Sequence, residues 1–171
     1  MNFEARIEPL GGALPKVTYH WDPETDILSV ACKGGAKANG LNGTVDLLGA
    51  DGSFVVIDVA EGCLHGVDVV AWPDDVRTVA ELATPDATKD GRVVFPSRRS
   101  QPAVAAVEVE AALTVEKNAA ESVFHLRVGR SRPVIVVRVA DRLLVEVDKQ
   151  ARIAGLWFID VPPFPNLEAT A

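Results

Sequence analysis

Cysteine is scarce in this 171-residue chain, and a long apolar run is absent. The two cysteines, Cys32 and Cys63, each lie inside an apolar stretch, which favours buried, reduced thiols over a disulfide framework. The opening MNFEARIEPL contains early charged residues and is not typical of a signal peptide. No apolar run approaches the roughly 18 residues of a membrane helix. These absences predict a cytoplasmic protein with no membrane contact.

An excess of positive charge is also absent. The chain carries 17 Lys and Arg against 24 Asp and Glu, which gives a formal net charge of -7 and a pI near 4.9. A nucleic-acid backbone would meet net repulsion, so we expect no nucleic-acid partner. Hydrophobic residues make up 48% of the chain, and a chain of this length can bury a core without disulfides or a structural metal.

The residues that are present alternate as they do in β-strands. In VEVEAALTVE, residues 107–116, apolar side chains alternate with glutamate and threonine, which predicts a strand with one buried face. Short apolar runs rich in β-branched residues, FVVIDV, PVIVVRV and LLVEV, predict strands that are covered on both faces. One segment, PDDVRTVAELA, predicts a short helix over Val76 to Leu82, capped by Asp74 or Asp75.

The two halves of the chain align with each other. Residues 17–30 align with residues 113–126 at a constant shift of 96, and residues 50–58 align with 140–148 at a shift of 90. The simplest explanation is a duplicated unit of about 55 residues. A chance match between two similar β patterns is the alternative.

The predicted fold is all-β, with two pseudo-repeated antiparallel β-meanders packed as a sandwich or partly closed barrel and one short helix. We expect residues 1–83 to form the first meander with its trailing helix, 84–102 a connector, and 103–171 the second meander with a proline-rich tail. The two meanders can form one compact domain. Gly66 and Gly155 match after one deletion, and each predicts a bend or a close backbone approach at the start of the last strand.

A family resemblance is carried by three segments, YHWDPETDILSV, VIDVAEGCLHGVDVV and VEVDKQARIAGLWFI. Together they resemble the small bacterial domain of unknown function numbered 2283, whose pattern opens with Tyr, Asp, Pro, Glu, any residue and Asp. The second half lacks this opening motif, and His20 and Trp21 displace its usual Tyr-Asp spacing in the first half. Because that family has no assigned activity, the resemblance implies a β-meander fold and a bacterial source, and it implies no catalytic residues.

The segment HWDPETD places His20, Asp22, Glu24 and Asp26 at every second position, which on a strand would form one polar face. The aligned residues of the second half do not keep this set. Pro23 lacks the N–H that a strand needs, and it follows Asp22 as in a type I turn, where the aspartate accepts a backbone N–H. We interpret the segment as a turn, with a hard-cation or acid/base site as the alternative.

No other pattern is typical of a catalytic or metal site. The histidines His20, His65 and His125 lack the spacing of zinc ligands, so we expect no metal and no cofactor, and we interpret each as exposed or hydrogen-bonded to one partner. No serine lies in a nucleophile-elbow motif. We therefore favour a non-enzymatic β-module that binds a protein partner or a small ligand. The alternative is a small hydrolase-type enzyme with a cleft between the repeats, using Asp22, Asp26 or His65.

Positive charge is concentrated in two segments. PSRRS contains Arg98 and Arg99, and RVGRSR contains Arg127, Arg130 and Arg132. Guanidinium groups suit phosphate and carboxylate, so Arg98, Arg99 and Arg130 are the candidate ligand-binding residues for a small anion. The simpler interpretation is a pair of solvated loops whose arginines pair with nearby Asp and Glu.

The last strand of the second half carries Trp157 and Ile159 on a face that is polar in the first half. A tryptophan buries on the order of 200 Å², and leaving it in water would forgo roughly a few kcal/mol, so we expect a cover. The cover can come from the same chain, around Phe3 to Ile7 or Val76 to Leu82. It can also come from a homodimer in which this face meets its symmetry mate, braced by Val161 to Pro165.

Overall fold

The computed structural model describes residues 4–35, 38–87, 89–97 and 105–165. These residues form strands and turns, with no helix among them, so the predicted all-β class is confirmed. The strands are β1 (Arg6–Glu8), β2 (Lys16–Trp21), β3 (Leu28–Lys33), β4 (Gly43–Leu48), β5 (Phe54–Ala60), β6 (Cys63–Ala71), β7 (Val76–Thr78), β8 (Lys89–Asp90), β9 (Arg92–Val94), β10 (Ala105–Glu110), β11 (Leu113–Lys117), β12 (Val123–Val128), β13 (Val134–Ala140), β14 (Leu143–Asp148) and β15 (Ile153–Ile159).

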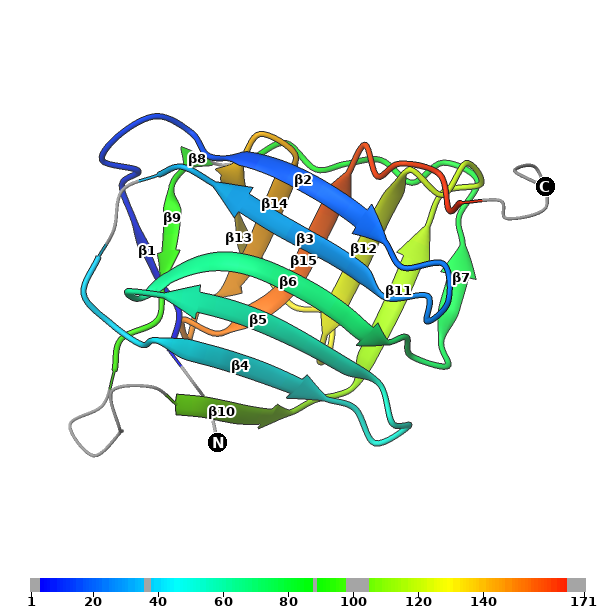
Figure 1. Ribbon diagram of the computed structural model, residues 1–171, viewed down its shortest axis with the longest axis horizontal. Coiled ribbons are helices and arrows are strands. Elements are labelled where there is room, and N and C mark those ends of the chain that lie inside the picture. Colours follow the sequence, from blue (N-terminus) through cyan, green and yellow to red (C-terminus); the bar gives the residue numbers. More distant parts are fainter. Residues whose placement is uncertain (1–3, 36–37, 88, 98–104, 166–171) are drawn as a thin grey trace.

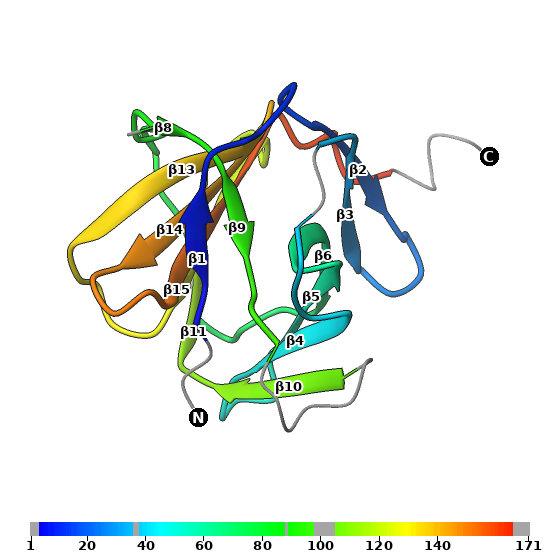
Figure 2. The same cartoon turned by 90° about the vertical axis from the view of Figure 1, so that its left-hand side faces the viewer.

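Two sheets face each other across one core (Figures 1 and 2). Sheet 1 has the order β1-β9-β6-β5-β4-β10, and the β2–β3 hairpin joins it where β3 pairs with β6. Sheet 2 has the order β7-β11-β12-β15-β14-β13-β8. The strands of sheet 1 cross in front of those of sheet 2 in Figure 1, and Figure 2 shows sheet 1 curling round to β10. The arrangement is a sandwich with a curled first sheet.

Each sheet contains five strands with the same order of pairing, β2-β3-β6-β5-β4 in sheet 1 and β11-β12-β15-β14-β13 in sheet 2. Gly66 lies opposite Asp58, and Gly155 lies opposite Glu146, with a register shift at the next residue in both cases. Asp58 is therefore the positional counterpart of Glu146, two residues from the Asp148 that the sequence alignment predicted. Side chains of a strand point to the same face at every second residue, so shifting the sequence alignment by two residues keeps inward residues aligned with inward residues.

The core lies between the sheets and is filled by the inward residues of both. On β5, Val55, Ile57 and Val59 are buried while the residues between them are partly exposed. On β15, Leu156 and Phe158 are buried in the same cluster. Each such side chain contributes roughly 1.5–3 kcal/mol by leaving water. One continuous cluster contains buried residues of both sheets and forms the main core, and a second, smaller cluster lies on sheet 2.

The free edge of β2 is fixed to sheet 2 by the turn between β13 and β14. The Val17 N–H donates to Asp141 Oδ1 at 2.8 Å, and the Tyr19 hydroxyl donates to the carbonyl oxygen of Arg142 at 2.5 Å. The Ile159 N–H donates to Tyr19 Oη at 3.0 Å. Burial raises the pKa of Tyr19, so its hydroxyl keeps the proton that it donates. These bonds satisfy backbone groups of an edge strand and join the two sheets on this side.

The helix predicted over Val76 to Leu82 is wrong. Residues 76–78 form β7, which pairs in parallel with β11, and the Val79 N–H continues the ladder to the carbonyl oxygen of Lys117 at 2.8 Å. Three of the four residues from Val76 to Val79 are β-branched, which suits a strand. The edge of β11 also offers backbone partners, whereas so short a helix would be marginal by itself.

The single strand predicted over residues 107–116 is two strands. β10 pairs in parallel with β4 in sheet 1, and β11 pairs with β12 in sheet 2, so the chain crosses between the sheets at Ala111 and Ala112. The predicted faces are right, because Val107 and Val109 pack against the core in which Leu113 and Val115 are buried. The alternation runs unbroken through the crossing and therefore does not mark it.

The segment 84–102, predicted as a connector, contributes to both sheets where the structure describes it. β9 pairs with β1 and β6, and β8 pairs in parallel with β13. Phe95 is buried in the core, its N–H donates to the carbonyl oxygen of Gly62, and its carbonyl accepts the N–H of Leu41. This segment is therefore part of the packed fold.

Candidate functional site

Four aromatic rings meet at the end of the molecule where β2 and β6 finish, on the right in Figure 1. They belong to Trp21 at the end of β2, Trp72 after β6, Phe124 in β12 and Phe164 in the C-terminal segment. The Trp21 ring stacks on Trp72 with centroids 5.8 Å apart. Phe124 and Phe164 meet the Trp21 ring edge-on at 6.0 and 5.4 Å. Such offset and edge-on contacts are favourable beyond the area that they bury.

Both indole groups are held by hydrogen bonds to backbone carbonyls. Trp21 Nε1–H donates to the carbonyl oxygen of Pro162 at 2.9 Å, and Trp72 Nε1–H donates to the carbonyl oxygen of Asp26 at 2.8 Å. An indole has a single donor, so each bond fixes the direction in which its ring points. The two tryptophans therefore form rigid walls.

The turn between β2 and β3 supplies one of these carbonyls, and it is the turn that the sequence predicted for HWDPETD. The Asp26 N–H donates to the Asp22 carbonyl oxygen at 2.9 Å, and the Glu24 N–H donates to Asp22 Oδ1 at 3.0 Å. Asp26 has a φ of 62°, in the left-handed region that turns use. The backbone N–H of Glu24 lowers the pKa of Asp22, with a smaller contribution from Thr25. Asp22 is therefore a turn-forming residue.

An open cavity of about 320 Å³ lies among the four rings. We call this cavity and its lining the aromatic pocket; it is lined by Trp21, Asp26, Trp72, Val76, Lys117, Glu121, Phe124 and Phe164. At the rim, Lys117 Nζ lies 3.2 Å from Glu121 Oε1. The pocket therefore combines apolar ring faces with a charged, solvent-accessible rim, which is the usual composition of a ligand site.

Exposed apolar surface is concentrated at the same place. Among the described residues, the large hydrophobic side chains classed as exposed are Val76, Ile135 and Phe164, at 37%, 44% and 39%. Two of the three, Val76 and Phe164, line the aromatic pocket. Apolar surface gathered around a cavity marks an interaction site more strongly than scattered exposed side chains do.

A second polar group lies on the outer face of sheet 2. His125 is buried, its Nε2 lies 2.7 Å from Glu146 Oε1, and its ring stacks on Trp157 with centroids 4.1 Å apart. Burial alone would raise the pKa of Glu146, but the hydrogen bond and charge of His125 outweigh it and lower that pKa. Gly155 makes room for this pair, since a Cβ there would meet both Glu146 Oε1 and His125 Nε2. The predicted close backbone approach is confirmed at Gly66, where a Cβ would stand 2.7 Å from the carbonyl oxygen of Val30, whereas at Gly155 the close groups are side chains. The His125 ring has one hydrogen-bond partner, Glu146, as predicted.

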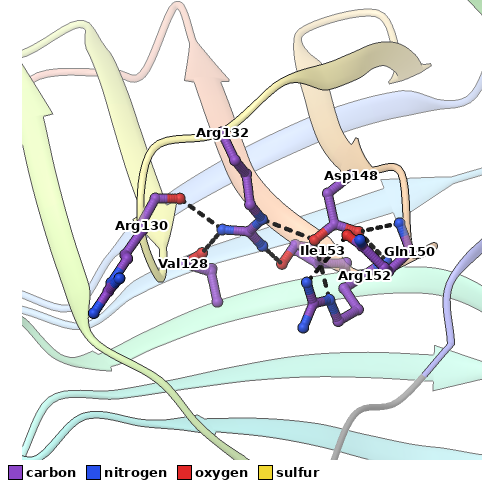
Figure 3. A network of polar contacts seen from close by, with 7 residues as sticks. All are labelled: Val128, Arg130, Arg132, Asp148, Gln150, Arg152 and Ile153. Carbon is purple, nitrogen blue, oxygen red and sulfur yellow. Dashed lines mark hydrogen bonds and ion pairs between the residues drawn. The ribbon is translucent and has the colours of Figure 1, made fainter.

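Two of the three arginines of RVGRSR pair with acidic groups, and Figure 3 shows the contacts of one of them, Arg132. Arg132 Nε lies 2.8 Å from Asp148 Oδ2, and its other nitrogens donate to the carbonyl oxygens of Val128, Arg130 and Ile153. Burial would raise the pKa of Asp148, but Arg132 and nearby backbone N–H groups lower it. Arg127 pairs with Glu116 at 3.3 Å.

These contacts fit the simpler interpretation of the arginines, because the guanidinium of Arg132 has its donors directed at protein acceptors. The side chain of Arg130 is exposed and points away from the Asp148 network in Figure 3. Arg98 and Arg99 lie outside the described residues. A site that combines these three arginines therefore stays a prediction.

The alternative hydrolase site named Asp22, Asp26 and His65, and the structure brings the two aspartates into one turn but leaves His65 apart from them. Asp26 lines the aromatic pocket beside Trp72, which follows the end of β6. His65 lies near the start of β6 and is exposed. A strand rises about 3.3 Å per residue, so the seven residues from His65 to Trp72 span roughly 20 Å. Asp26 therefore lies beyond the end of β6, whereas His65 lies near the start of the same strand.

The Trp157 face is covered within the chain. Trp157 is 6% exposed and lies in a cluster with Val136 and Leu144, against which Leu82, Ala87 and Ile159 pack. The cover is thus the segment that follows β7, and it includes Leu82 from the intramolecular alternative. The burial of Trp157, which motivated the homodimer, is accounted for by a single subunit.

The two cysteines are free thiols, Cys32 buried and Cys63 half-buried. Burial, with a smaller effect of Asp141, raises the pKa of Cys32 to about 12, which leaves it protonated and unreactive at neutral pH. Within the described residues, no group of three His, Cys, Asp or Glu side chains is arranged to hold a metal ion.

Sequence reasoning missed the aromatic pocket, because its residues come from segments up to 143 positions apart, between Trp21 and Phe164. The scarcity of tryptophan was the one signal in the sequence that could have indicated this site. The chain has three tryptophans, and two of them stand at or just beyond strand ends, where an aromatic ring is free to face a cavity.

No model of a known protein family matches the chain, and no curated protein matches it. The described residues also contain no helix long and apolar enough to span a membrane.

Proposed function

We propose that the protein is a non-enzymatic binding module and that its ligand site is the aromatic pocket. The observation that carries this proposal is the cavity of about 320 Å³ walled by four aromatic rings, with two of the exposed large hydrophobic side chains at its margin. The residue types support binding: indole and phenyl faces supply contact area at little cost in side-chain entropy. Among the described residues that line the pocket there is no serine, threonine or cysteine to act as a hydroxyl or thiol nucleophile.

The three indole N–H groups give a direct test by nuclear magnetic resonance. A library of small aromatic fragments is titrated into ¹⁵N-labelled protein, and the indole signals are followed. We expect fragments that bind to shift the signals of Trp21 and Trp72 and to leave that of Trp157 in place, because Trp157 is buried on the outer face of sheet 2. Assignment comes from single Trp→Phe variants.

A matched pair of variants separates the pocket from exposed apolar surface in general. Val76→Ala trims the pocket wall and should weaken fragment binding, whereas Ile135→Ala truncates a somewhat more exposed side chain outside the pocket and should not. Fragments that shift Trp157 alone, or that bind both variants as well as the parent chain, would refute the pocket as the ligand site.

We also infer that the two five-strand units descend from one duplicated unit. The inference is supported by the shared pairing order and by the glycine that faces a carboxylate in each unit, Gly66 with Asp58 and Gly155 with Glu146. In sequences of relatives, the two glycines should occupy matching places relative to their strands. Relatives in which one unit is complete and the other has an unrelated strand order would contradict the duplication.

A further inference from the structure

The aromatic pocket already holds one segment rich in proline, residues Val161–Pro165 of the same chain. The Val161 N–H donates to the carbonyl oxygen of Ser122 at 2.9 Å, and the Pro162 carbonyl accepts the hydrogen bond of Trp21. Two residues further on, the ring of Phe164 meets Trp21 edge-on. The chain thus shows which kind of segment these rings accept.

The segment meets Trp21 through a backbone carbonyl and the ring of Phe164, and its prolines favour the extended course that presents both. Prolines at 162, 163 and 165 have no N–H and hold φ near −65°, so the segment favours an extended, polyproline-like course with its carbonyls available as acceptors. Trp21 supplies the complementary group, a rigid indole that donates one hydrogen bond beside apolar ring faces. Aromatic-lined grooves recognise proline-rich peptides in this way, at a low cost in conformational entropy.

The resident segment is buried at its start and exposed beyond it. Val161 is buried at 3% exposure, whereas residues 162–165 are exposed and Phe164 is 39% exposed. The polar contact made by these four exposed residues at the pocket is the single bond from Trp21. Next to it the cavity bounded by Trp72 and Phe124 is open to solvent. A segment of the same chemistry can therefore approach the rings and replace the resident one.

We propose that the ligand of the aromatic pocket is a proline-rich peptide segment of another protein, with an aromatic residue between prolines, and that it displaces Pro162–Pro165 from Trp21. This rests on the proposed function of the pocket. Displacement follows because the single indole donor of Trp21 serves one carbonyl at a time. A positively charged flank is favoured, because the rim carries Asp26 and Glu121 against Lys117 and the chain has a net charge of -7.

The resident segment competes with an added peptide for the pocket, and the strength of this competition depends on the short stretch of chain that tethers the segment. A short tether presents its end at an effective concentration on the order of 1 mM. If the segment binds its own site with a dissociation constant of about 100 µM, the pocket is about 90% occupied and a peptide binds roughly tenfold more weakly than it would to the free pocket. Phe164→Ala weakens the resident segment and should recover most of that tenfold.

The experiment titrates two synthetic peptides into the full chain and follows the indole signals. The probe peptide has the sequence VPPFP between two lysines, and the control replaces its prolines with alanine. We expect the probe to shift the Trp21 signal, the control to leave it unchanged, and Phe164→Ala to bind the probe roughly tenfold more tightly. Trp21→Phe keeps a ring and removes the donor, so it should lose binding, with an unchanged Trp157 signal showing that it is folded.

Other outcomes overturn the proposal in distinguishable ways. Weaker binding of the probe to Phe164→Ala would mean that the peptide lies beside the resident segment, which contradicts displacement. Absence of probe binding to either chain, while aromatic fragments still shift Trp21 and Trp72, would remove the proline-rich ligand and leave the proposed function standing. A mass that rises with protein concentration in light scattering, and that Phe164→Ala abolishes, would make the occupant a second copy of this chain.

Discussion

The two five-strand units share a pairing order and differ on their outer faces. The outer face of sheet 1 carries half-buried carboxylates, Asp46, Asp58 and Asp68. At the place of Asp68, sheet 2 carries Trp157, which stacks on His125 beneath a cover that includes Leu82. Pairing order is set by the backbone ladders and by the inward faces that form the common core. The outer face can therefore change from polar to aromatic wherever another segment covers it.

The comparison is sharpest at Asp58 and Glu146, which face Gly66 and Gly155 at matching places. Burial raises the pKa of Asp58, and the neighbouring carboxylate of Asp68 raises it further. Burial also acts to raise the pKa of Glu146, but the hydrogen bond and charge of His125 reverse the sign. Neighbours on the adjoining strands, rather than the backbone position, decide which charge state is stable.

The largest expected effect comes from truncating the aromatic side of this comparison. Trp157→Ala should lower the free energy of unfolding by about 3–5 kcal/mol, because it leaves a cavity among Val136, Leu144 and Leu82. The matched change Asp68→Ala should alter it by less than about 0.5 kcal/mol, since that side chain is only half-buried. Urea unfolding measures both, and equal losses would show that the two outer faces do not differ energetically.

A smaller effect is expected from the two glycines. A Cβ at Gly66 would stand 2.7 Å from the carbonyl oxygen of Val30, which belongs to the paired strand and cannot move freely. Gly66→Ala should therefore cost about 1–3 kcal/mol. Gly155→Ala should cost less, because Glu146 can swing aside, but it should break the bond to His125. Gly12→Ala is the control in urea unfolding, with open space at its Cβ and an expected change within about 0.5 kcal/mol.

The smallest expected effects on the free energy of unfolding come from removing the charge of the two matching carboxylates, Glu146 and Asp58. These effects have opposite signs in the two units and depend on pH. Glu146→Gln should destabilise by about 1–2 kcal/mol at neutral pH, because a charge-assisted hydrogen bond is lost. The folded-state pKa of Glu146 lies below its ordinary value of 4.5, so this contribution is present above pH 4.5 and is lost as the pH falls through the folded pKa.

Asp58→Asn should do the opposite. The folded-state pKa of Asp58 lies above its ordinary 3.8, so ionisation opposes folding at neutral pH, and this penalty disappears as the pH falls below 3.8. We expect a gain of no more than about 0.5 kcal/mol at pH 7. Urea unfolding of both variants from pH 3 to 7 tests the pair, and two changes of the same sign at pH 7 would contradict the assigned surroundings.

Much of the local structure was predictable because its causes are local. Period-two alternation predicted strands and their inward faces, as at Val107 and Val115, and the Asp22–Pro23 pair predicted the turn whose hydrogen bonds stay within five residues. The helix prediction over Val76 to Leu82 failed for a non-local reason. The edge of β11 offers backbone hydrogen-bond partners to residues 76–78, and these bonds stabilise a strand there more than the local sequence stabilises a helix.

By itself the sequence determined the all-β class, because alternation and β-branched content act on each strand separately. Tertiary structure alone decided where the chain crosses between sheets at Ala111, how Leu82 covers Trp157, and how the rings of the aromatic pocket meet. Each of these depends on contacts between segments far apart in the chain. Their free energy comes from apolar surface that leaves water only when both partners are in place, which no single stretch of sequence records.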